Sequence, residues 1–597
     1  MLPDMRISFP PFFLRRSPIA GTVKICSSAC SGKNIEIFLS DSAGQVISHG
    51  KAAADGTFSL PATDLKEGVY KLTVRCGKDE FSRIIRKLPY CPGEVRFNQY
   101  GVMLVDGKPF TPYGWFRLNL VDGSKDGYNV VAYYNAPWQS DEELKEYLDQ
   151  AHRHGLKVLT YCYPRGSMMT NSAYRKILSE ADAKLIRSRV EKFSRHPALL
   201  AWYLADEPEY EPWLRARLEK VEEICRTADP WHPTCIANNS IDGVHKYRFI
   251  GDISLADYYP GFLEGGDSAS PIGRYGELLA ASRKTDNRAQ WGVPQGFTWN
   301  AYGSKGHRIP DYDELRNMHY QTLLNGHTGI IWYSHELNYS EPALHIHVKK
   351  LLDEMKLFHA LWQNPQKRKE LVLTSNLIAA SYHDVNQHDF VIAVNLMPKD
   401  QEISLQAPSA TPFYIAGEKG KSVSVQNGMI RDRLGRYRTR VYTTDATLAS
   451  AFTAQAEIDA VSSAEKALHR PGNLAYYRAS GIKLTSSLMT DPRIPLYQLC
   501  DGAYSSIHVF DRYKDKRCEV TLIFPKKIKF ARLELYGRKI RSFQVFTPAG
   551  KFGEYHAGNS EFGRVQKTVP VETDRITVSS FDGFGISEIE IYSNAVQ

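Results

Sequence analysis

The feature that most constrains the fold is a repeated alternation of short apolar segments with amphipathic segments between residues 96 and 366. The apolar segments number eight and read TPYGWFRL, YNVVAYYN, LKVLTYCYP, LLAWYLADE, PTCIANNS, ISLADYYPG, AQWGVPQGF and TGIIWYSHE. Apolar strands separated by amphipathic helices are typical of parallel βα units. Eight units in about 255 residues match the size of a (β/α)8 barrel, about 250 residues, whereas a doubly wound sheet usually needs fewer. The sequence therefore predicts a (β/α)8 barrel over 96–366.

One helical segment of the repeat shows the local signals clearly. Ser140 and Glu143 have the spacing of a capping box, in which two side chains bind the free backbone N–H groups of a first helical turn. The apolar positions that follow recur at helical spacing and are Leu144, Leu148 and Ala151. Gly155 ends the segment, because glycine readily adopts the left-handed conformation that closes a helix. We expect an amphipathic helix here, followed at once by the next strand.

Segments with β-strand patterns flank the predicted barrel. Short alternating strands with Gly, Asp and Ser turns indicate an immunoglobulin-like β-sandwich over 19–92. Alternation returns over 370–450 and again over 471–597, which predicts two further sandwiches, and 451–470 is expected to be a linker between them. The expected fold class is therefore multidomain α/β plus all-β, with a central TIM barrel flanked by β-sandwich domains.

Composition narrows the class of protein. Hydrophobic residues at 43% and charged residues at 24% are ordinary for folded globular protein. The net charge of +9 is small for 597 residues, and Lys and Arg are scattered, so nucleic-acid binding is not indicated. No apolar run of about 18 residues predicts a membrane span. The opening segment is broken by prolines and makes a poor signal peptide, so we expect a cytoplasmic protein, or a secreted or periplasmic one if an export signal is missing from this sequence. The oligomeric state is not indicated.

Cysteine and arginine patterns add two minor expectations. The nine cysteines lack metal-site spacing, and only Cys26 and Cys30 are close enough in sequence to suggest a disulfide. An arginine-rich stretch alternates mostly at period two, which predicts the solvent-exposed face of a strand. Its arginines are Arg431, Arg433, Arg436, Arg438 and Arg440.

Chemistry is expected at the carboxyl ends of the eight strands, because the βα loops of a barrel converge on that face. The side chains at these ends are Trp115, Arg117, Tyr134, Asn135, Tyr163, Arg165, Asp206, Glu207, Asn238, Asn239, Asp257, Tyr258, Gln295, Trp299, Trp332, His335 and Glu336. Carboxylates, amides and aromatic rings suit sugars. The ends lack a glycine-rich phosphate loop, an HExxH motif and a GxSxG elbow. We therefore expect a carbohydrate partner and neither a metal nor a cofactor.

Glu207 is the strongest candidate for a catalytic acid. Hydrolysis of a glycosidic bond requires a protonated carboxyl group beside the leaving oxygen, and usually a second carboxylate as nucleophile or base. Glu207 follows the apolar strand LLAWYL and precedes Pro208, so its carboxyl is expected to lie partly desolvated in the pocket with a raised pKa. The neighbouring Asp206 is expected to strengthen that shift by like-charge repulsion. The alternative is that the pair only caps the next helix or binds an arginine.

The motif Ala205-Asp206-Glu207-Pro208 resembles that of glycoside hydrolase clan A, whose acid/base Glu ends the fourth strand in an Asn-Glu-Pro-like sequence. The resemblance covers about 100–365 and includes VDGKPFTPYGWF at the first strand; RDRLGRYRTRVYTT resembles the small β-domain that follows many such barrels. It implies hydrolysis of β-linked glycosides with Glu207 as general acid/base. Asp206 stands where the clan has Asn, which places the family's mode of binding the sugar 2-hydroxyl in doubt.

The second carboxylate is not settled by the sequence. The clan's nucleophilic Glu is expected on the seventh strand, where this chain has Gln295, and an amide cannot attack the anomeric carbon. Glu336, after the eighth strand, or Asp257, at the end of the sixth, can supply the missing group, and Glu336 is slightly favoured. Alternatively, the Asp206-Glu207 pair resembles that of hexosaminidases that use the acetamido group of the substrate. A barrel that binds sugar without cleaving it is the third alternative.

The remaining candidates are assigned to substrate binding or to packing. Those expected to contact sugar are Trp115, Tyr134, Asn239, Asp257, Tyr258, Gln295 and Trp332, although the two tryptophans also suit the barrel core. His335 is expected to support a neighbour by a hydrogen bond, and His345 and His347 to be structural.

The last predicted region resembles the discoidin-like sugar-binding modules attached to many glycosidases. The resemblance rests on Asn473-Leu474-Ala475, Leu499-Cys500-Asp501-Gly502 and the closing strand from Ile586 to Tyr592. It implies a carbohydrate-binding module over 471–597, without naming binding residues, and a purely structural role is an equal alternative.

Overall fold

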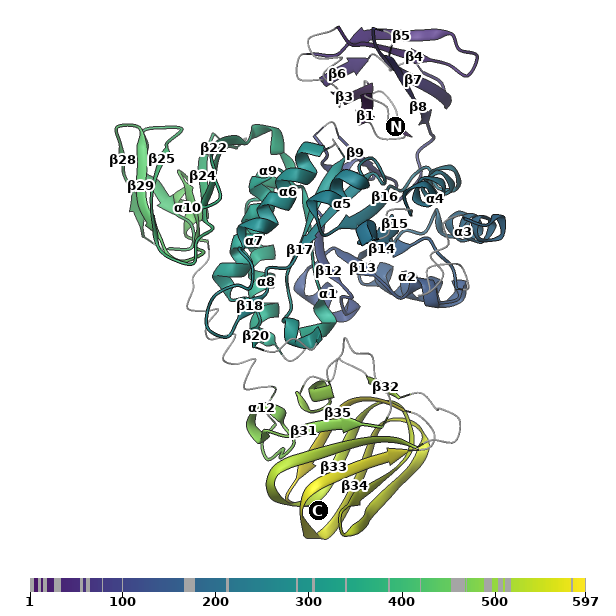
Figure 1. Ribbon diagram of the computed structural model, residues 1–597, viewed down its shortest axis with the longest axis vertical. Helices are drawn as coiled ribbons and strands as arrows, with labels where there is room; N and C mark the ends of the chain where they lie inside the picture. Colours follow the sequence, from purple (N-terminus) through teal and green to yellow (C-terminus); the bar gives the residue numbers. More distant parts are fainter. Residues whose placement is uncertain are drawn as a thin grey trace.

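A computed structural model of the chain contains a central barrel with β-rich regions before and after it (Figure 1). The structure describes the chain except for residues 1–4, 9–11, 14–18, 26–33, 54–56, 61–64, 78, 99, 166–177, 211–213, 286–287, 303–305, 339–340, 385–386, 419, 452–467, 469, 488–495, 503–507, 511–516, 581–583 and 596–597. Cys26, Cys30 and most of the expected linker lie outside the described residues. Within this described part, no helix is long and apolar enough to cross a membrane.

Eight parallel strands close into the barrel, each paired with the next along the chain and the last with the first. They are β12 (Tyr113–Phe116), β13 (Val130–Tyr133), β14 (Lys157–Tyr161), β15 (Leu199–Asp206), β16 (Thr234–Asn238), β17 (Ile253–Tyr258), β19 (Ala289–Pro294) and β21 (Gly329–Trp332). Each lies within one of the eight apolar segments, so the predicted (β/α)8 fold is confirmed.

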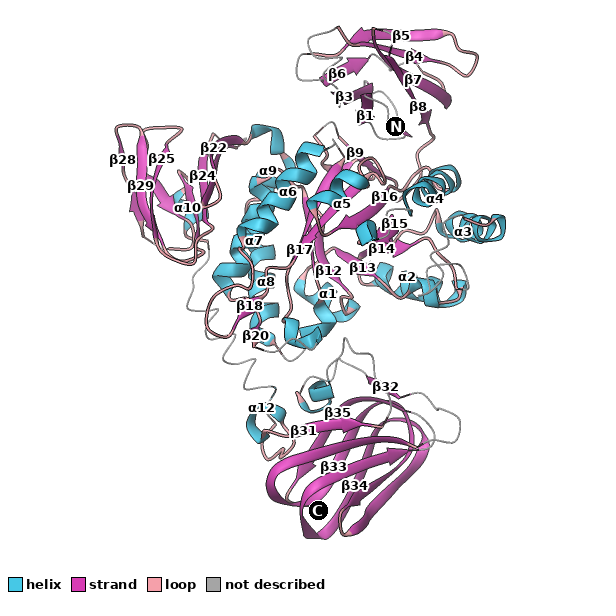
Figure 2. Cartoon of the chain, in the orientation of Figure 1, coloured by secondary structure: helices cyan, strands magenta, loops and turns pink. Residues whose placement is uncertain are grey.

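Helices surround these strands (Figure 2). They are α1 (Leu120–Asp126), α2 (Asp141–Arg153), α3 (Glu180–Phe193), α4 (Leu214–Ala228), α5 (Ile241–Lys246), α6 (Gly273–Thr285), α7 (Tyr312–Leu324), α8 (Pro342–Leu357) and α9 (His359–Gln363). In α2, Ser140 and Glu143 form the predicted capping box, and Leu144, Leu148 and Ala151 are its buried positions. Both the start and the buried face of α2 therefore follow from local sequence.

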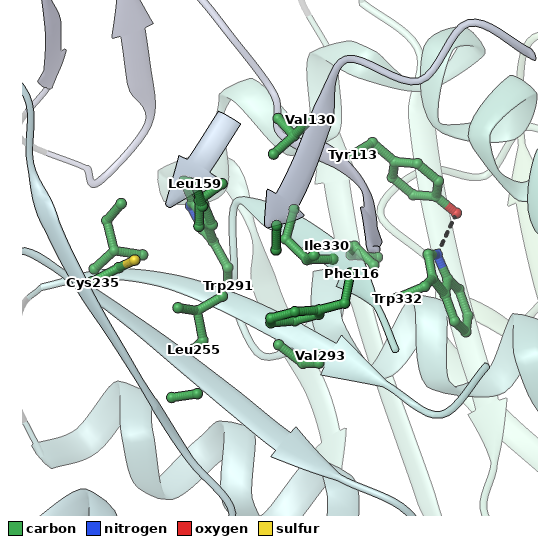
Figure 3. Close-up of a cluster of buried hydrophobic side chains, with 14 of the residues drawn as sticks. Tyr113, Phe116, Val130, Leu159, Cys235, Leu255, Trp291, Val293, Ile330 and Trp332 are labelled. Atoms are coloured by element: carbon green, nitrogen blue, oxygen red, sulfur yellow. Dashed lines mark hydrogen bonds between the residues drawn. The ribbon is translucent and has the colours of Figure 1, made fainter. Parts of the chain in front are cut away.

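Large apolar side chains fill the interior of the barrel. Trp115, Trp291 and Trp332 are all 0% exposed, and Figure 3 shows strand residues converging around Trp291 and Phe116. Trp332 Nε1 donates to Tyr113 Oη at 3.1 Å, so this buried indole has a polar partner (Figure 3). The interior is thus a packed core, and ligands can approach only the ends of the strands.

The region before the barrel consists of antiparallel sheets. Its strands are β1 (Met5–Ser8), β2 (Phe12–Phe13), β3 (Ile19–Ile25), β4 (Glu36–Ser40), β5 (Val46–Lys51), β6 (Thr57–Leu60), β7 (Gly68–Cys76) and β8 (Asp79–Lys87), in the orders β1-β3-β6 and β2-β8-β7-β4-β5. Only the pair β2 and β8 is parallel. Three short strands, β9 (Val95–Phe97), β10 (Met103–Val105) and β11 (Lys108–Pro109), then lead into β12.

A two-sheet β-structure follows the barrel. Its strands are β22 (Lys369–Leu373), β23 (Leu377–His383), β24 (Asp389–Asn395), β25 (Gln401–Gln406), β26 (Phe413–Ile415), β27 (Ser422–Val423), β28 (Val425–Gln426), β29 (Met429–Leu434) and β30 (Thr439–Thr443), followed by α10 (Ala446–Ala449). It packs on α7, where Asn317 Nδ2 donates to the carbonyls of Asn395 and Tyr437, both at 2.8 Å.

The arginine run belongs to this region and differs from its prediction. Arg431 and Arg433 are exposed as expected, but the other three are half-buried. Arg436 contacts Glu314 at the start of α7 at 2.7 Å, and Arg440 forms ion pairs with Glu418 and Asp432. The expectation of one solvent-exposed strand face is wrong, because the run spans β29, a turn and the start of β30. Acidic side chains of α7, of the loop at Glu418 and of β29 itself face its last three guanidinium groups.

The C-terminal region forms an antiparallel β-structure with its own apolar core. Its elements are α12 (Tyr477–Ser480), β31 (Lys483–Ser486), β32 (His508–Phe510), β33 (Cys518–Thr547), β34 (Gly550–Ser580) and β35 (Phe584–Tyr592). Asn473 Oδ1 accepts from the backbone N–H groups of Ala475 and Ile591, both at 3.0 Å, and thereby ties the start of the region to its last strand. In Figure 1 this region lies beneath the barrel, on the side where β18 (Phe262–Leu263) and β20 (His307–Arg308) are drawn.

Candidate active site

Glu207 lies directly after β15 in an unusual backbone conformation. Its φ is +45°, in the left-handed region that non-glycine residues rarely adopt. Its N–H donates to the carbonyl of Ala237 on β16 at 3.1 Å, which fixes the turn against the neighbouring strand. Such strained positions cluster at functional sites, where the surrounding structure holds them in place. The turn therefore marks the end of β15 as a candidate active site.

The carboxyl groups of Glu207 and Asp257 interact directly: the negative charge of Glu207 raises the pKa of Asp257, and the protonated Asp257 stabilises the ionised form of Glu207. Asp257 belongs to β17 and is 3% exposed. Burial, followed by the negative charge of Asp206, raises the pKa of Glu207 to about 7, and burial together with the charge of Glu207 raises the pKa of Asp257 well above its ordinary value. Two adjacent buried carboxyls cannot both ionise at low cost, so the pair holds a shared proton at neutral pH.

Asp206 is held by two tyrosine hydroxyls. Tyr203 Oη donates to Asp206 Oδ1 at 2.5 Å, and Tyr134 Oη donates to Oδ2 at 2.9 Å. Burial raises the pKa of Asp206, and the two hydroxyls oppose that shift. Both carboxylate oxygens are therefore occupied, and Asp206 acts on Glu207 through its charge.

Glu209 is a buried acid of the site that the sequence analysis missed. Its Oε1 accepts from the backbone N–H of Asn239 at 2.6 Å, and its Oε2 accepts from Asn238 Nδ2 at 3.0 Å. Gly243 allows this approach, because a Cβ at that position would clash with the Glu209 carboxylate. Glu209 thus joins the loop after β15 to the loop after β16. The sequence signal for it was the pair Asn238 and Asn239, whose N–H donors need a hydrogen-bond acceptor nearby.

Asn239 is placed by the same contacts beside the acid pair. Its side chain forms a hydrogen bond with Glu207 that favours the ionised form and partly offsets the rise in the Glu207 pKa. The structure therefore brings together Asp206, Glu207, Asn239 and Asp257 from three adjacent strands, with Tyr134 from a fourth.

Glu336 has a cationic partner. It follows β21 in a short 3-10 turn (His335–Asn338) and forms an ion pair with the Arg117 guanidinium. Arg117 also lies over the ring of Tyr134, 5.4 Å from its centroid. A guanidinium partner favours the ionised carboxylate, the form that a nucleophile needs, so Glu336 stays a candidate for the second carboxylate beside Asp257, which interacts with Glu207 directly.

Three residues expected to contact sugar are wholly buried. Trp115 and Trp332 are 0% exposed within the barrel core. Gln295 is also 0% exposed; its Oε1 accepts from the N–H of Gly261 and its Nε2 donates to the carbonyl of Phe297, both at 2.8 Å. Gln295 therefore connects the loops after β17 and β19. These three side chains pack inside the protein, and their expected sugar contacts stay a prediction.

Tyr259, and not Tyr258, faces the acid pair. The Tyr258 hydroxyl bonds Ser270 Oγ at 2.8 Å, whereas the Tyr259 hydroxyl lies 3.5 Å from Asp257 Oδ2. Side chains two residues apart along a strand point to the same face. The strand alternation that predicts Asp257 in the site therefore also predicts Tyr259 there.

The histidines near the site are structural. His335 is buried, and burial lowers its pKa well below the ordinary value, so it is neutral. Its ring packs against those of His345 and Trp115, at centroid distances of 4.4 and 5.6 Å. Across the residues that the structure describes, no group of three or more His, Cys, Asp or Glu side chains is arranged to hold a metal ion.

Comparison with known proteins gives structural neighbours only. No protein-family model and no curated protein matches the chain. Among solved structures, a Bacteroides fragilis protein provisionally named an alpha-galactosidase covers 74% of this chain and 97% of its own, with 11% identity and a TM-score of 0.41. A family 39 glycoside hydrolase from Bacteroides cellulosilyticus covers 74% and 100%, with 11% identity and a TM-score of 0.37. Alpha-galactosidase I from Mortierella vinacea covers 57% and 98%, with 13% identity and a TM-score of 0.39. These neighbours are glycoside hydrolases, but likeness of this degree carries no argument about the activity of this chain, which has to rest on its own residues.

Proposed function

We propose that the chain is a glycoside hydrolase that cleaves β-linked glycosides with Glu207 and Asp257 as its catalytic carboxyl pair. The observation that carries the proposal is the presence of two neighbouring acids at the carboxyl ends of β15 and β17, both with a pKa that burial raises. The β-linkage rests on the resemblance of the Ala205-Asp206-Glu207-Pro208 motif to clan A and is the least constrained part of the proposal.

Glu207 has the properties of a general acid. With a pKa of about 7 it retains its proton in a large fraction of molecules at neutral pH, and a general acid is most efficient when its pKa lies near the working pH. Its place on the open face of the barrel lets it reach the oxygen of a bound glycoside. The elements of acid catalysis are therefore present in one side chain.

Asp257 is assigned as the nucleophile. Two carboxyl groups that interact directly lie closer than the spacing of about 6.5–9.5 Å that an inverting enzyme needs for its water, so the pair fits the retaining mechanism, whose carboxyl groups are about 5–5.5 Å apart. We place the shared proton on Glu207 when substrate is bound, which leaves Asp257 ionised. In the proposed first step, Glu207 gives this proton to the glycosidic oxygen while the Asp257 carboxylate attacks the anomeric carbon. The C–O bond to the leaving group breaks, and a glycosyl ester forms on Asp257. Water then attacks this ester and gives its proton to Glu207.

The two alternatives are less well supported. Substrate assistance requires Asp206 to bind an acetamido group, and tyrosine hydroxyls at 2.5 and 2.9 Å already use one acceptor site on each of its oxygens. A silent binding scaffold has no need of two acids buried together without a cation, an arrangement that costs free energy. Catalytic sites often accept such a cost, because a carboxyl group with a raised pKa can donate its proton to the substrate.

The test is turnover of a panel of p-nitrophenyl glycosides that includes both anomers and N-acetyl-β-hexosaminides. The wild-type protein should release nitrophenol from at least one of them, and Glu207→Gln should lower kcat for that substrate by about 10²–10⁴-fold. Asp257→Asn should have a comparable effect, because it removes the attacking oxyanion. Thermal unfolding of each variant checks that the fold is intact, and Glu336→Gln, outside the pair, is the matched comparison. Near-normal turnover by Glu207→Gln would refute the assignment.

A further inference from the structure

A cluster of aromatic side chains lies beside the acid pair, on the loops after β17, β19 and β21. We call it the aromatic wall; it consists of Tyr259, Phe297, Trp299, Tyr302 and Tyr333. Phe297 lies at its centre, 5.1 Å from Tyr259, 5.2 Å from Trp299, 5.4 Å from Tyr302 and 5.7 Å from Tyr333, measured between ring centroids. Tyr259, Trp299 and Tyr333 pack around Phe297, and Tyr259 and Tyr333 also pack against the barrel core. Trp299 and Tyr302 do not belong to that core.

The wall begins at the acid pair and extends away from it. The Tyr259 hydroxyl lies 3.5 Å from Asp257 Oδ2, and the Tyr259 ring stacks on Tyr333 at a centroid distance of 5.6 Å. Trp299 follows one ring further out, 6.2 Å from Tyr259. A ligand that reaches Asp257 therefore has an aromatic surface along one side.

The loop that carries Trp299 and Tyr302 is held in place by several contacts. Its strand β20 pairs with β18 from the neighbouring loop. Arg308 on β20 forms two hydrogen bonds with the Glu314 carboxylate, both 2.7 Å, and thereby fixes the loop to the start of α7. At the other end, the buried Gln295 amide bonds both loops. The wall is thus a built feature with a defined geometry.

The outer rings of the wall are accessible. Phe297 is 0% exposed and supports the others, whereas Tyr302 is 36% exposed, and Tyr259, Trp299 and Tyr333 are half-buried. The hydroxyls of Tyr302 and Tyr333 lie 2.9 Å apart, which fixes the two rings relative to each other. Flat rings with polar edges, held rigidly, bind the apolar faces of sugar rings at a low cost in conformational entropy.

We propose that the aromatic wall is a second sugar subsite, in which Trp299 and Tyr302 bind the ring next to the one at the acid pair. The natural substrate is therefore an oligosaccharide or polysaccharide, not a simple monoglycoside. This inference rests on the proposed function for the position of the first ring, but binding of the second ring requires no turnover.

The test uses the full-length Glu207→Gln protein, so that binding is measured without cleavage. Cellotriose, xylotriose, mannotriose and chitotriose are each titrated by calorimetry beside the corresponding monosaccharide. We expect at least one triose to bind with a Kd at least about ten-fold lower than its monosaccharide, because a second ring adds contact area. Adding Trp299→Ala should reduce that difference to about two-fold or less.

Conservative variants separate a binding role from a folding role. Tyr302→Phe keeps the ring and loses only the hydroxyl contact, and Trp299→Phe keeps a smaller flat face, so both should retain most of the preference for the triose. Two exposed aromatics outside the wall are matched controls: Tyr414, 38% exposed on β26, and Trp138, 48% exposed after β13. Their alanine variants should bind the triose as the parent does.

Three results would overturn the subsite. These are a triose affinity no better than that of the monosaccharide for all four sugars, an unchanged preference in Trp299→Ala, or a loss of preference in Trp138→Ala instead. The proposed function fails by a different readout, the turnover of nitrophenyl glycosides by the wild-type protein. If the protein binds trioses through Trp299 but hydrolyses no glycoside, the subsite proposal stands and the proposed enzymatic function is refuted.

Discussion

Two buried acids of this protein lie in opposite electrostatic surroundings. Glu354, 1% exposed on α8, is bound by the Arg316 guanidinium at 3.0 Å and by the hydroxyls of Tyr312 and Tyr320. Burial acts to raise the pKa of Glu354, but Arg316 and the two hydroxyls outweigh it and hold the pKa below its ordinary value. Glu207 instead has Asp257 and Asp206 as neighbours, and its pKa rises to about 7.

The difference shows that one buried acid of this chain stabilises the fold, whereas the other has the properties of a catalytic group. The pair of Glu354 and Arg316 satisfies its own charges and joins α7 to α8, where Arg316 also bonds the carbonyl of Thr439 in the following β-region. The pair of Glu207 and Asp257 leaves a negative charge and a proton without a compensating cation. A charged group balanced by its partner suits structure, whereas an unbalanced one with a movable proton suits catalysis.

The largest expected contrast is in activity. Glu207→Gln should lower kcat by about 10²–10⁴-fold, whereas Glu354→Gln should leave kcat per folded molecule within about two-fold, because it is remote from the proposed chemistry. Both are measured with the best nitrophenyl glycoside of the panel, with the folded fraction determined by circular dichroism. Equal losses in the two variants would remove the distinction between the two acids.

The second contrast is in the free energy of unfolding, which should fall in Glu354→Gln and rise in Glu207→Gln. Glu354→Gln leaves Arg316 buried without its counter-ion and should cost about 3–5 kcal/mol in the free energy of unfolding. Urea denaturation at pH 7 measures the cost, and Lys349→Gln, whose ion pair with Asp353 on the same helix is exposed, is the control and should change stability by less than about 1 kcal/mol.

Glu207 should show the opposite effect, with a defined dependence on pH. Its folded pKa of about 7 lies above the ordinary value of 4.5, so its contribution to stability is complete below about pH 4.5 and is lost as pH rises through 7. Glu207→Gln removes this loss and should be more stable than the wild-type protein by about 2 kcal/mol at pH 8, with a smaller difference at pH 5. A variant that is less stable at pH 8 would indicate that Glu207 is held by favourable ion pairing.

The smallest expected effect tests Asp206. Asp206→Asn removes the charge that helps to raise the pKa of Glu207, and its single amide oxygen can still accept from one of the two tyrosine hydroxyls. The alkaline limb of the kcat/KM profile, expected near pH 7, should move to lower pH by up to about one unit. Tyr203→Phe, which leaves that charge in place, is the comparison and should not move the limb downward. An unchanged limb in Asp206→Asn would exclude a role of its charge.

Local sequence predicted the parts of the fold and site that depend on neighbours along the chain. The eight strands, the capping box of α2 and the position of Glu207 at the end of β15 all follow from short periodic patterns and turn signals. The contribution of Asp206 to the raised pKa of Glu207 could also be predicted, because the two residues are adjacent in the sequence.

The errors concern contacts between residues distant in sequence. The partnership of Glu336 with Arg117 and that of Arg436 with Glu314 depend on how loops and sheets meet, and no local pattern encodes them. Gln295, which the sequence places where the clan has its nucleophile and which was assigned to sugar binding, has an amide that bonds two loops. The choice between Asp257 and Glu336 was open for the same reason, since both end a strand.

The most direct test of the account is the titration of the carboxyl pair itself. Infrared difference spectra between the wild-type protein and Glu207→Gln, recorded from pH 4 to pH 9, follow the carbonyl band of a protonated carboxylic acid. We predict that this band persists in the wild-type protein up to about pH 7, where Glu207 loses its proton. Disappearance of the band near the ordinary glutamate pKa of 4.5 would contradict the shared proton and the catalytic role built on it.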